Sequence, residues 1–161
     1  MKSTGEVMGI SENFGLSFYK ATLSAGIKLP ESGLVFISVN NEDKFKIISI
    51  ARAFKELGFN IVATEGTAEE LIKNGISVET VYKAGEGRPN IVDRIKNNEI
   101  DLVINTPVGA QSRYDEEAIG RACIQKSIMA ITTLSAADAV LYAIRTKNKI
   151  KVKSIHEYHS N

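Results

Sequence analysis

Short apolar runs alternate with helical patterns along almost the whole chain. We predict strands at 34–39, 60–63, 78–81, 102–105 and 129–132. We predict a helix that Lys44 opens and Gly58 ends, with an apolar stripe from Ile47 to Leu57, and further helices at about 67–73, 91–96, 116–125 and 136–145. The first run, Leu-Val-Phe-Ile-Ser-Val, is rich in β-branched residues and suits a strand covered on both faces. Strands that alternate with helices form a parallel sheet with right-handed crossovers. The sequence therefore predicts a single α/β domain, a three-layer α/β/α sandwich with a Rossmann-like parallel sheet of about five strands.

Two further elements are predicted at the ends of this pattern. Apolar residues recur at helical spacing from 12 to 25, and Gly26 supplies a stop, so we predict a helix that leads into the domain. Residues 150–158 alternate well enough to predict an edge strand. Lysines at every second position from Lys147 to Lys153 would then point to solvent, where they discourage strand-to-strand aggregation rather than bind a polyanion.

Length and charge limit the classes of function. The 161 residues suffice for one domain with a substantial core, and a net charge of +1 with 24% charged residues indicates neither a nucleic-acid surface nor an acidic tail. No apolar run is long enough to cross a bilayer, and the N-terminus does not look like a signal peptide. We therefore expect a cytoplasmic protein with no nucleic-acid and no membrane partner.

The cysteine and histidine residues do not predict a metal or catalytic centre. Cys123 is the single cysteine and lies in the apolar part of a helical pattern with Ile119 and Ala122, so we expect a buried, inert thiol. His156 and His159 lie three residues apart, with no cysteine or acidic pair arranged around them as a metal site needs. We expect both histidines at the surface.

Polar residues gather where the predicted strands end. They are Ser38 and Lys44, then Thr64, Gly66 and Thr67, then 83–88, then Asn105 and Thr106, and finally Thr132 and Thr133. Ligands of an open parallel sheet bind beyond the carboxyl ends of its strands, so we expect these loops to share one rim. The Thr64–Thr67 turn is the best candidate for an anion cradle, because Gly66 lets the backbone approach and the next helix presents free N–H groups. Phosphate is the expected ligand, and Lys44 and Lys83 would add positive charge beside it.

Several of these residues also have ordinary structural roles. Residues 67–70, Thr-Ala-Glu-Glu, fit a capping box in which Thr67 starts the helix. Asn105 precedes a Thr-Pro pair that makes a normal strand exit, so a contact to a base or ribose and a purely structural role are equally supported. Asp115 and the two glutamates after it are suited to the first turn of a helix. Thr133 and Ser135 likewise fit helix caps.

Four stretches resemble a known family. They are 2–9 (Lys-Ser-Thr-Gly-Glu-Val-Met-Gly), 60–67 (Asn-Ile-Val-Ala-Thr-Glu-Gly-Thr), 83–91 (Lys-Ala-Gly-Glu-Gly-Arg-Pro-Asn-Ile) and 101–107 (Asp-Leu-Val-Ile-Asn-Thr-Pro). Their order and spacing are similar to the C-terminal allosteric domain of the large chain of bacterial carbamoyl-phosphate synthase, a methylglyoxal-synthase-like domain. The resemblance implies that 1–9 is the tail of a preceding ATP-binding domain, or a linker, and that 10–161 is the methylglyoxal-synthase-like domain.

The resemblance also implies a ligand and the residues that bind it. In that family the nucleotide monophosphates UMP, an inhibitor, and IMP, an activator, bind in the crevice of this domain. The positions that match the phosphate and ribose contacts are Lys44, Thr64, Thr67, Lys83 and Asn105. Weaker candidates are Ser38, Gly66 and Asp115. Thr132 matches a threonine that, in the enteric type, helps to bind ornithine at the junction with the preceding domain.

The parent enzyme implied by the resemblance is an ATP-dependent carbon–nitrogen ligase. It makes carbamoyl phosphate from bicarbonate, glutamine-derived ammonia and two ATP, with Mg or Mn, for pyrimidine and arginine biosynthesis. Its large chain works with a small glutaminase chain and associates into homo-oligomers partly through this domain. This chain shows no ATP-binding machinery and no paired nucleophile and base, so we expect it to have no catalysis and no cofactor of its own.

Two departures from the family pattern leave alternatives open. Pro107 stands where the enteric type has a nucleotide-contacting threonine, and Glu65 replaces a histidine beside the cradle. One alternative is therefore a domain that has lost effector binding and serves assembly alone. Another is methylglyoxal synthase itself, which eliminates phosphate from dihydroxyacetone phosphate with a carboxylate base. The Gly-Asp-Gln run that holds its catalytic Asp is missing, and Glu86 is the possible substitute.

Overall fold

Five parallel strands form the central sheet of the computed structural model, which describes residues 2–3, 5–107 and 113–159. The strands are β3 (Gly33–Val39), β4 (Phe59–Thr64), β5 (Glu79–Val81), β6 (Leu102–Thr106) and β7 (Met129–Ile131). Their order in the sheet is β5-β4-β3-β6-β7. The chain therefore moves outward from β3 in one direction and then returns to β6 on the other side of β3. This reversal creates a switch point between the carboxyl ends of β3 and β6.

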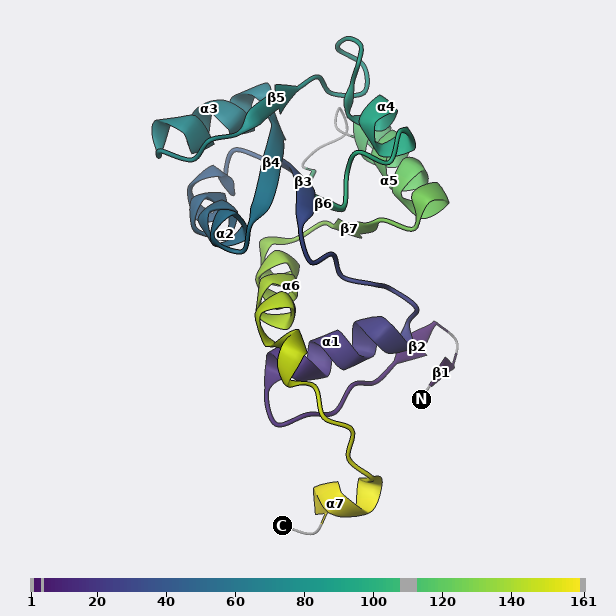
Figure 1. Ribbon diagram of the computed structural model, residues 1–161. Coiled ribbons are helices and arrows are strands. Elements are labelled where there is room, and N and C mark those ends of the chain that lie inside the picture. Colours follow the sequence, from purple (N-terminus) through teal and green to yellow (C-terminus); the bar gives the residue numbers. More distant parts are fainter. Residues whose placement is uncertain (1, 4, 108–112, 160–161) are drawn as a thin grey trace.

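Helices cover both faces of this sheet, which confirms the predicted three-layer α/β/α fold (Figure 1). One face packs against α2 (Lys44–Glu56), α3 (Glu65–Lys73) and α6 (Leu134–Thr146). The other packs against α4 (Ile91–Lys96) and α5 (Arg113–Lys126). Successive side chains of β3 alternate between the faces, since Val35 and Ile37 join the first core and Phe36 joins the second. All three are fully buried, as expected for a central parallel strand.

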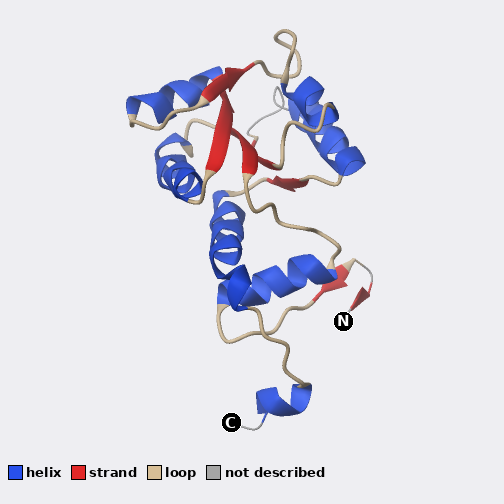
Figure 2. Cartoon of the chain, in the orientation of Figure 1, coloured by secondary structure: helices blue, strands red, loops and turns tan. Residues whose placement is uncertain are grey.

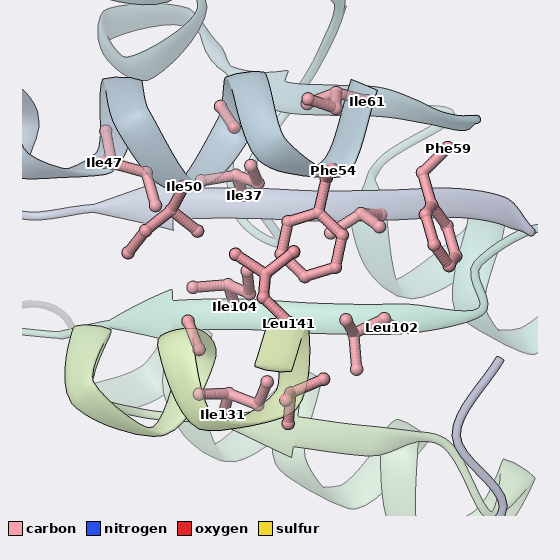
Figure 3. Packing of buried hydrophobic residues seen from close by; sticks show 14 of the residues in the cluster. Ile37, Ile47, Ile50, Phe54, Phe59, Ile61, Leu102, Ile104, Ile131 and Leu141 are labelled. Atoms are coloured by element: carbon pink, nitrogen blue, oxygen red, sulfur yellow. The ribbon is translucent and has the colours of Figure 1, made fainter. Parts of the chain in front are cut away.

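The larger core lies between the sheet and the α2, α3 and α6 layer. Figure 3 shows Phe54 of α2 among Ile37, Ile104 and Leu141 of this core. The rings of Phe54 and Phe59 meet edge to face, with centroids 5.5 Å apart and an interplanar angle of 88°. This is a preferred geometry for aromatic pairs, and both side chains are almost completely buried.

The N-terminal part of the chain packs beside α6 rather than on the sheet (Figure 2). The helix α1 (Phe14–Ser24) begins after Asn13, whose side-chain oxygen accepts a hydrogen bond from Leu16 N at 3.0 Å. A Cβ at Gly15 would lie 2.4 Å from the Tyr142 ring, so the close approach of α1 to α6 depends on glycine at this position. Before α1, β1 (Lys2–Ser3) and β2 (Glu6–Val7) form a small antiparallel pair.

The predicted edge strand at 150–158 is wrong. A short 3-10 helix, η2 (Lys147–Lys149), follows α6, and the chain ends in a second helix, α7 (Ile155–His159). Ser154 and Glu157 explain why α7 forms, because the Glu157 carboxylate accepts from Ser154 N at 2.6 Å and Ser154 Oγ accepts from Glu157 N at 3.3 Å. This reciprocal capping box starts a helix where the apolar alternation suggested a strand.

The two histidines of this C-terminal segment, His156 and His159, lie in α7 and are exposed, as predicted. Within the described ranges, no helix combines the length and the apolar character needed to cross a bilayer.

Cys123 lies on the sheet side of α5 and is 1% exposed, which confirms the predicted buried thiol. Burial raises the pKa of this thiol from 9.0 to about 11. Since the thiolate is the reactive form, we expect native protein at pH 8 to react with a thiol reagent about 100-fold more slowly than the unfolded chain. Labelling in buffer and in denaturant measures the two rates. Equal rates would show that α5 does not shield this residue.

Candidate functional site

A crevice of about 280 Å³ lies at the switch point, beyond the carboxyl ends of β3, β4 and β6. Its wall has an apolar part, formed by Phe36, Ile91 and Ile119. The polar lining residues come from several separate segments and are Ser38, Asn40, Thr64, Lys83, Asn105, Thr106 and Asp115. An apolar wall beside a few converging polar groups is the usual composition of a small-molecule site.

Five of the predicted site residues meet in this crevice, namely Ser38, Thr64, Lys83, Asn105 and Asp115. They come from the ends of β3, β4 and β6, from the loop after β5 and from the first turn of α5. The parallel sheet brings them together because the carboxyl ends of its strands share one edge.

Lys44 and Gly66 lie beside the crevice lining, at the N-termini of α2 and α3. They are close to each other, since a Cβ built on Gly66 would lie 3.3 Å from Lys44 Nζ. The Lys44 ammonium is thus placed at the start of α3, where the N–H groups of the first turn and the helix dipole also favour an anion.

Thr67 has a different role from the helix cap that the sequence suggested. The helix α3 begins at Glu65, and Thr64 is the residue at its N-cap. Thr67 is 1% exposed, and its Oγ1 accepts a hydrogen bond from Val39 N at 3.2 Å. Thr64 Oγ1 lies 3.4 Å from Thr67 Oγ1 and 3.2 Å from Ser38 Oγ, so the three hydroxyls form a chain from the interior to the crevice.

Thr132 is not among the residues that line the crevice. It lines a neighbouring hollow together with Thr133 and Asp138, near the N-terminus of α6, and this hollow shares Asn40, Thr106 and Pro107 with the crevice. Thr133 is the N-cap of that helix, as predicted from the sequence, and its side chain accepts a hydrogen bond from Ala136 N at 3.2 Å. Ser135 is the second residue of α6 rather than its cap.

Asn40 is a crevice residue that the sequence analysis missed. Its side-chain amide donates to Asp43 Oδ2 at 2.7 Å and to Thr106 Oγ1 at 3.1 Å, and its backbone N–H donates to the same Thr106 hydroxyl at 3.3 Å. These bonds tie the loop after β3 to the end of β6 across the switch point. The Asn-x-x-Asp spacing after a strand is a local signal for such a turn, but it does not reveal the partner in β6.

The loop that carries Lys83 is held by two neighbours. The amide of Asn90 donates to Ala84 O and Gly87 O, both at 3.1 Å, while Asn90 also caps α4 in a capping box with Asp93. At the end of the loop, Arg88 pairs with Asp93, and this hydrogen bond lowers the pKa of the Asp93 carboxyl. The loop is therefore fixed to the start of α4.

The two departures noted in the sequence fall at different places. Pro107 lines the crevice. Glu65 instead lines an adjoining acidic hollow, which also contains Glu79, Glu86 and Glu99. Glu86 is consequently not placed among the crevice residues, where a base for methylglyoxal synthase chemistry would have to lie. Across the described ranges, no three His, Cys, Asp or Glu side chains group as a metal site requires.

Residues 46–132 match the family model of the MGS-like domain. This chain therefore belongs to the MGS-like domain family. Its relatives include large chains of carbamoyl phosphate synthase. It is 51% identical over 162 residues to that of Archaeoglobus fulgidus, a match that covers 99% of this chain and 15% of the relative. It is 53% identical over 151 residues to the "Carbamoyl phosphate synthase large chain, C-terminal section" of Aquifex aeolicus, covering 94% of this chain and 28% of the relative.

Solved structures agree on the fold. The crystal structure of methylglyoxal synthase from Elizabethkingia anophelis NUHP1 superposes with a TM-score of 0.60, covering 83% of this chain and 93% of that chain. A structure of ForH superposes with a TM-score of 0.52, covering 73% and 82%. Each is 17% identical to this chain, so both likenesses show the fold alone.

Proposed function

We propose that this chain is the allosteric domain of a carbamoyl phosphate synthase large chain and that its crevice binds a nucleoside monophosphate such as UMP or IMP. The observation that supports this most directly is the meeting of Thr64, Lys83 and Asn105 around one cavity at the switch point. The high identity to synthase large chains over almost the whole chain supports the parent enzyme.

The chemistry of the crevice suits the parts of a nucleotide. The Lys83 ammonium and the hydroxyls of Ser38 and Thr64 are donors for a phosphate, and Lys44 adds positive charge at the start of α3. Asn105 has an amide that can bond a ribose or a base edge. Val39 and Pro107 are half-buried apolar residues of the lining and provide a surface for the base.

Thr67 acts indirectly in this proposal. Its hydroxyl is buried and already accepts from Val39 N, so it orients Thr64 rather than contacting the ligand. Gly66 contributes because it has no side chain, and this leaves room for Lys44 beside the first turn of α3. Asp115 also lines the crevice, where its carboxylate can accept a hydrogen bond from a ribose hydroxyl or from an N–H of the base.

The parent activity is part of the same proposal. The complete enzyme would join bicarbonate and glutamine-derived ammonia with two ATP, using Mg or Mn, in the cytoplasm, for pyrimidine and arginine biosynthesis. Its partners would be the preceding ATP-binding domain, the small glutaminase chain and further copies of the large chain. A bound nucleotide would favour one packing of this domain against the ATP-binding domain, with a coupling free energy of about 1 to 3 kcal/mol. Thr132 and its hollow would lie toward that junction and take part in the response to ornithine.

Calorimetric titration of this chain with UMP, and separately with IMP, should give saturable binding of one nucleotide per chain. Uridine is the matched control, because it keeps the base and ribose but lacks the phosphate. We expect uridine to bind at least about 10-fold more weakly, since hydrogen bonds to a charged phosphate each contribute about 1.5 to 3 kcal/mol. Absence of heat with both nucleotides at millimolar concentration would contradict the proposal and favour a domain that serves assembly alone.

A further inference from the structure

We infer that the Glu86 carboxylate competes with a ligand anion for the Lys83 ammonium. It thereby weakens the affinity of the crevice for phosphate-bearing ligands. This inference rests on the proposed function, because it concerns the same nucleotide site. It assigns to Glu86 the role of setting affinity, in place of the catalytic role considered for it from the sequence.

The turn from Lys83 to Glu86 folds the carboxylate back onto the lysine. The backbone N–H of Glu86 donates to Lys83 O at 3.2 Å, which closes the turn. Glu86 Oε1 then lies 3.3 Å from Lys83 Nζ, and Oε2 lies 3.4 Å from Lys83 N. One carboxylate thus engages both the ammonium and the backbone N–H of the same residue. These are the two kinds of donor that a phosphate oxygen would use.

The two side chains belong to different hollows. Lys83 lines the crevice, whereas Glu86 lines the adjoining acidic hollow. The ion pair therefore joins the only lysine among the described lining residues of the crevice to a group outside the lining, and a ligand anion must compete with Glu86 for the ammonium. Both side chains are about half exposed, at 47% and 51%, so the pair is weak enough for a nucleotide phosphate to displace.

The described cation of the acidic hollow, Arg94, does not pair with Glu86 in place of Lys83. Arg94 is the cation there, and it is already paired with Glu79 at 2.7 Å and with Glu99 at 3.0 Å. Glu65, at the start of α3, adds another carboxylate to the same hollow. Lys83 is thus the cation that the structure pairs with Glu86.

The test is the affinity of the Glu86→Gln variant for UMP and IMP, measured by titration of this chain. The substitution keeps the size of the side chain and removes its charge. We expect the dissociation constant to fall about twofold to fivefold, the range expected when an exposed ion pair no longer competes. Glu31→Gln is the charge control, because the exposed Glu31 pairs with Lys147 at 2.7 Å just before the N-terminal end of β3, whereas the crevice lies at the carboxyl ends of the strands. It changes the net charge equally and should leave the affinity unchanged.

The possible results separate this inference from the proposed function. Unchanged or weaker binding by Glu86→Gln would overturn the inference while wild-type binding still supported the site. An equal gain in Glu31→Gln would also overturn it, since the effect would then come from net charge. A gain that persists in a Lys83→Met background would do the same, because the competition must act through that lysine. If the wild type binds neither nucleotide, the proposed function fails, and the inference then depends on whether Glu86→Gln restores binding.

Discussion

Replacing Phe54 with alanine should lower the free energy of unfolding by about 3 to 5 kcal/mol, the usual cost of removing a buried phenyl ring. Phe54 is fully buried between α2 and the sheet, and its ring meets the edge of Phe59. The substitution removes apolar area from the larger core and leaves a cavity that the close-packed surroundings fill only in part. Urea denaturation followed by circular dichroism measures the change.

Phe45→Ala is the matched control for this prediction. Phe45 lies on the same helix but is 84% exposed, so its loss should change the free energy of unfolding by no more than about 0.5 kcal/mol. Similar losses for the two variants would mean that α2 does not present Phe54 to the sheet in the register described.

Replacing Lys83 with methionine should raise the dissociation constant for UMP about 10-fold to 100-fold. Methionine keeps the length of the apolar stem but removes the ammonium, and a hydrogen bond to a charged group contributes about 1.5 to 3 kcal/mol. Stability should change little, because the lysine is about half exposed and its pair with Glu86 lies at the surface. Calorimetric titration gives the affinity, and denaturation of the same sample checks the fold.

Lys46→Met controls for the general loss of positive charge. Lys46 is an exposed residue of α2 that lines the hollow near α6 rather than the crevice. Its replacement should leave the affinity for UMP within about twofold, because the ammonium of Lys46 is solvent-exposed and does not line the crevice, so its charge is screened by salt. If both lysine variants bind UMP as the wild type does, the nucleotide site lies elsewhere.

The strands were predictable because buried parallel strands need nearly continuous apolar runs. The predicted run 34–39 became Gly33–Val39, and 129–132 became Met129–Ile131. Helix starts were less accurate, since the helix predicted from residue 67 begins at Glu65. At the C-terminus, a local capping box formed by Ser154 and Glu157 outweighed a weak alternation. Short-range hydrogen bonds decide element boundaries, and an apolar pattern does not record them.

The candidate site was predictable as a rim but not residue by residue. Polar residues at strand ends had to converge in any parallel sheet of this kind, and Ser38, Thr64 and Asn105 do so. The buried position of Thr67 depends on its bond to Val39 N, which joins two segments far apart in the chain. The hydrogen bond from Asn40 to Thr106 also joins two segments far apart in the chain, so no local motif predicts it.

The sequence by itself determined the class of fold, the alternation along the chain of the five parallel strands with the helices between them, and the group of polar residues at the strand ends. These properties follow from apolar periodicity, which acts along the chain. The tertiary structure decided which of those residues face the crevice, which support it from behind, and that Glu86 holds Lys83 beside it. Such choices depend on contacts between segments that only folding brings together, because the direction of a side chain is set by the neighbours that pack and hydrogen-bond around it.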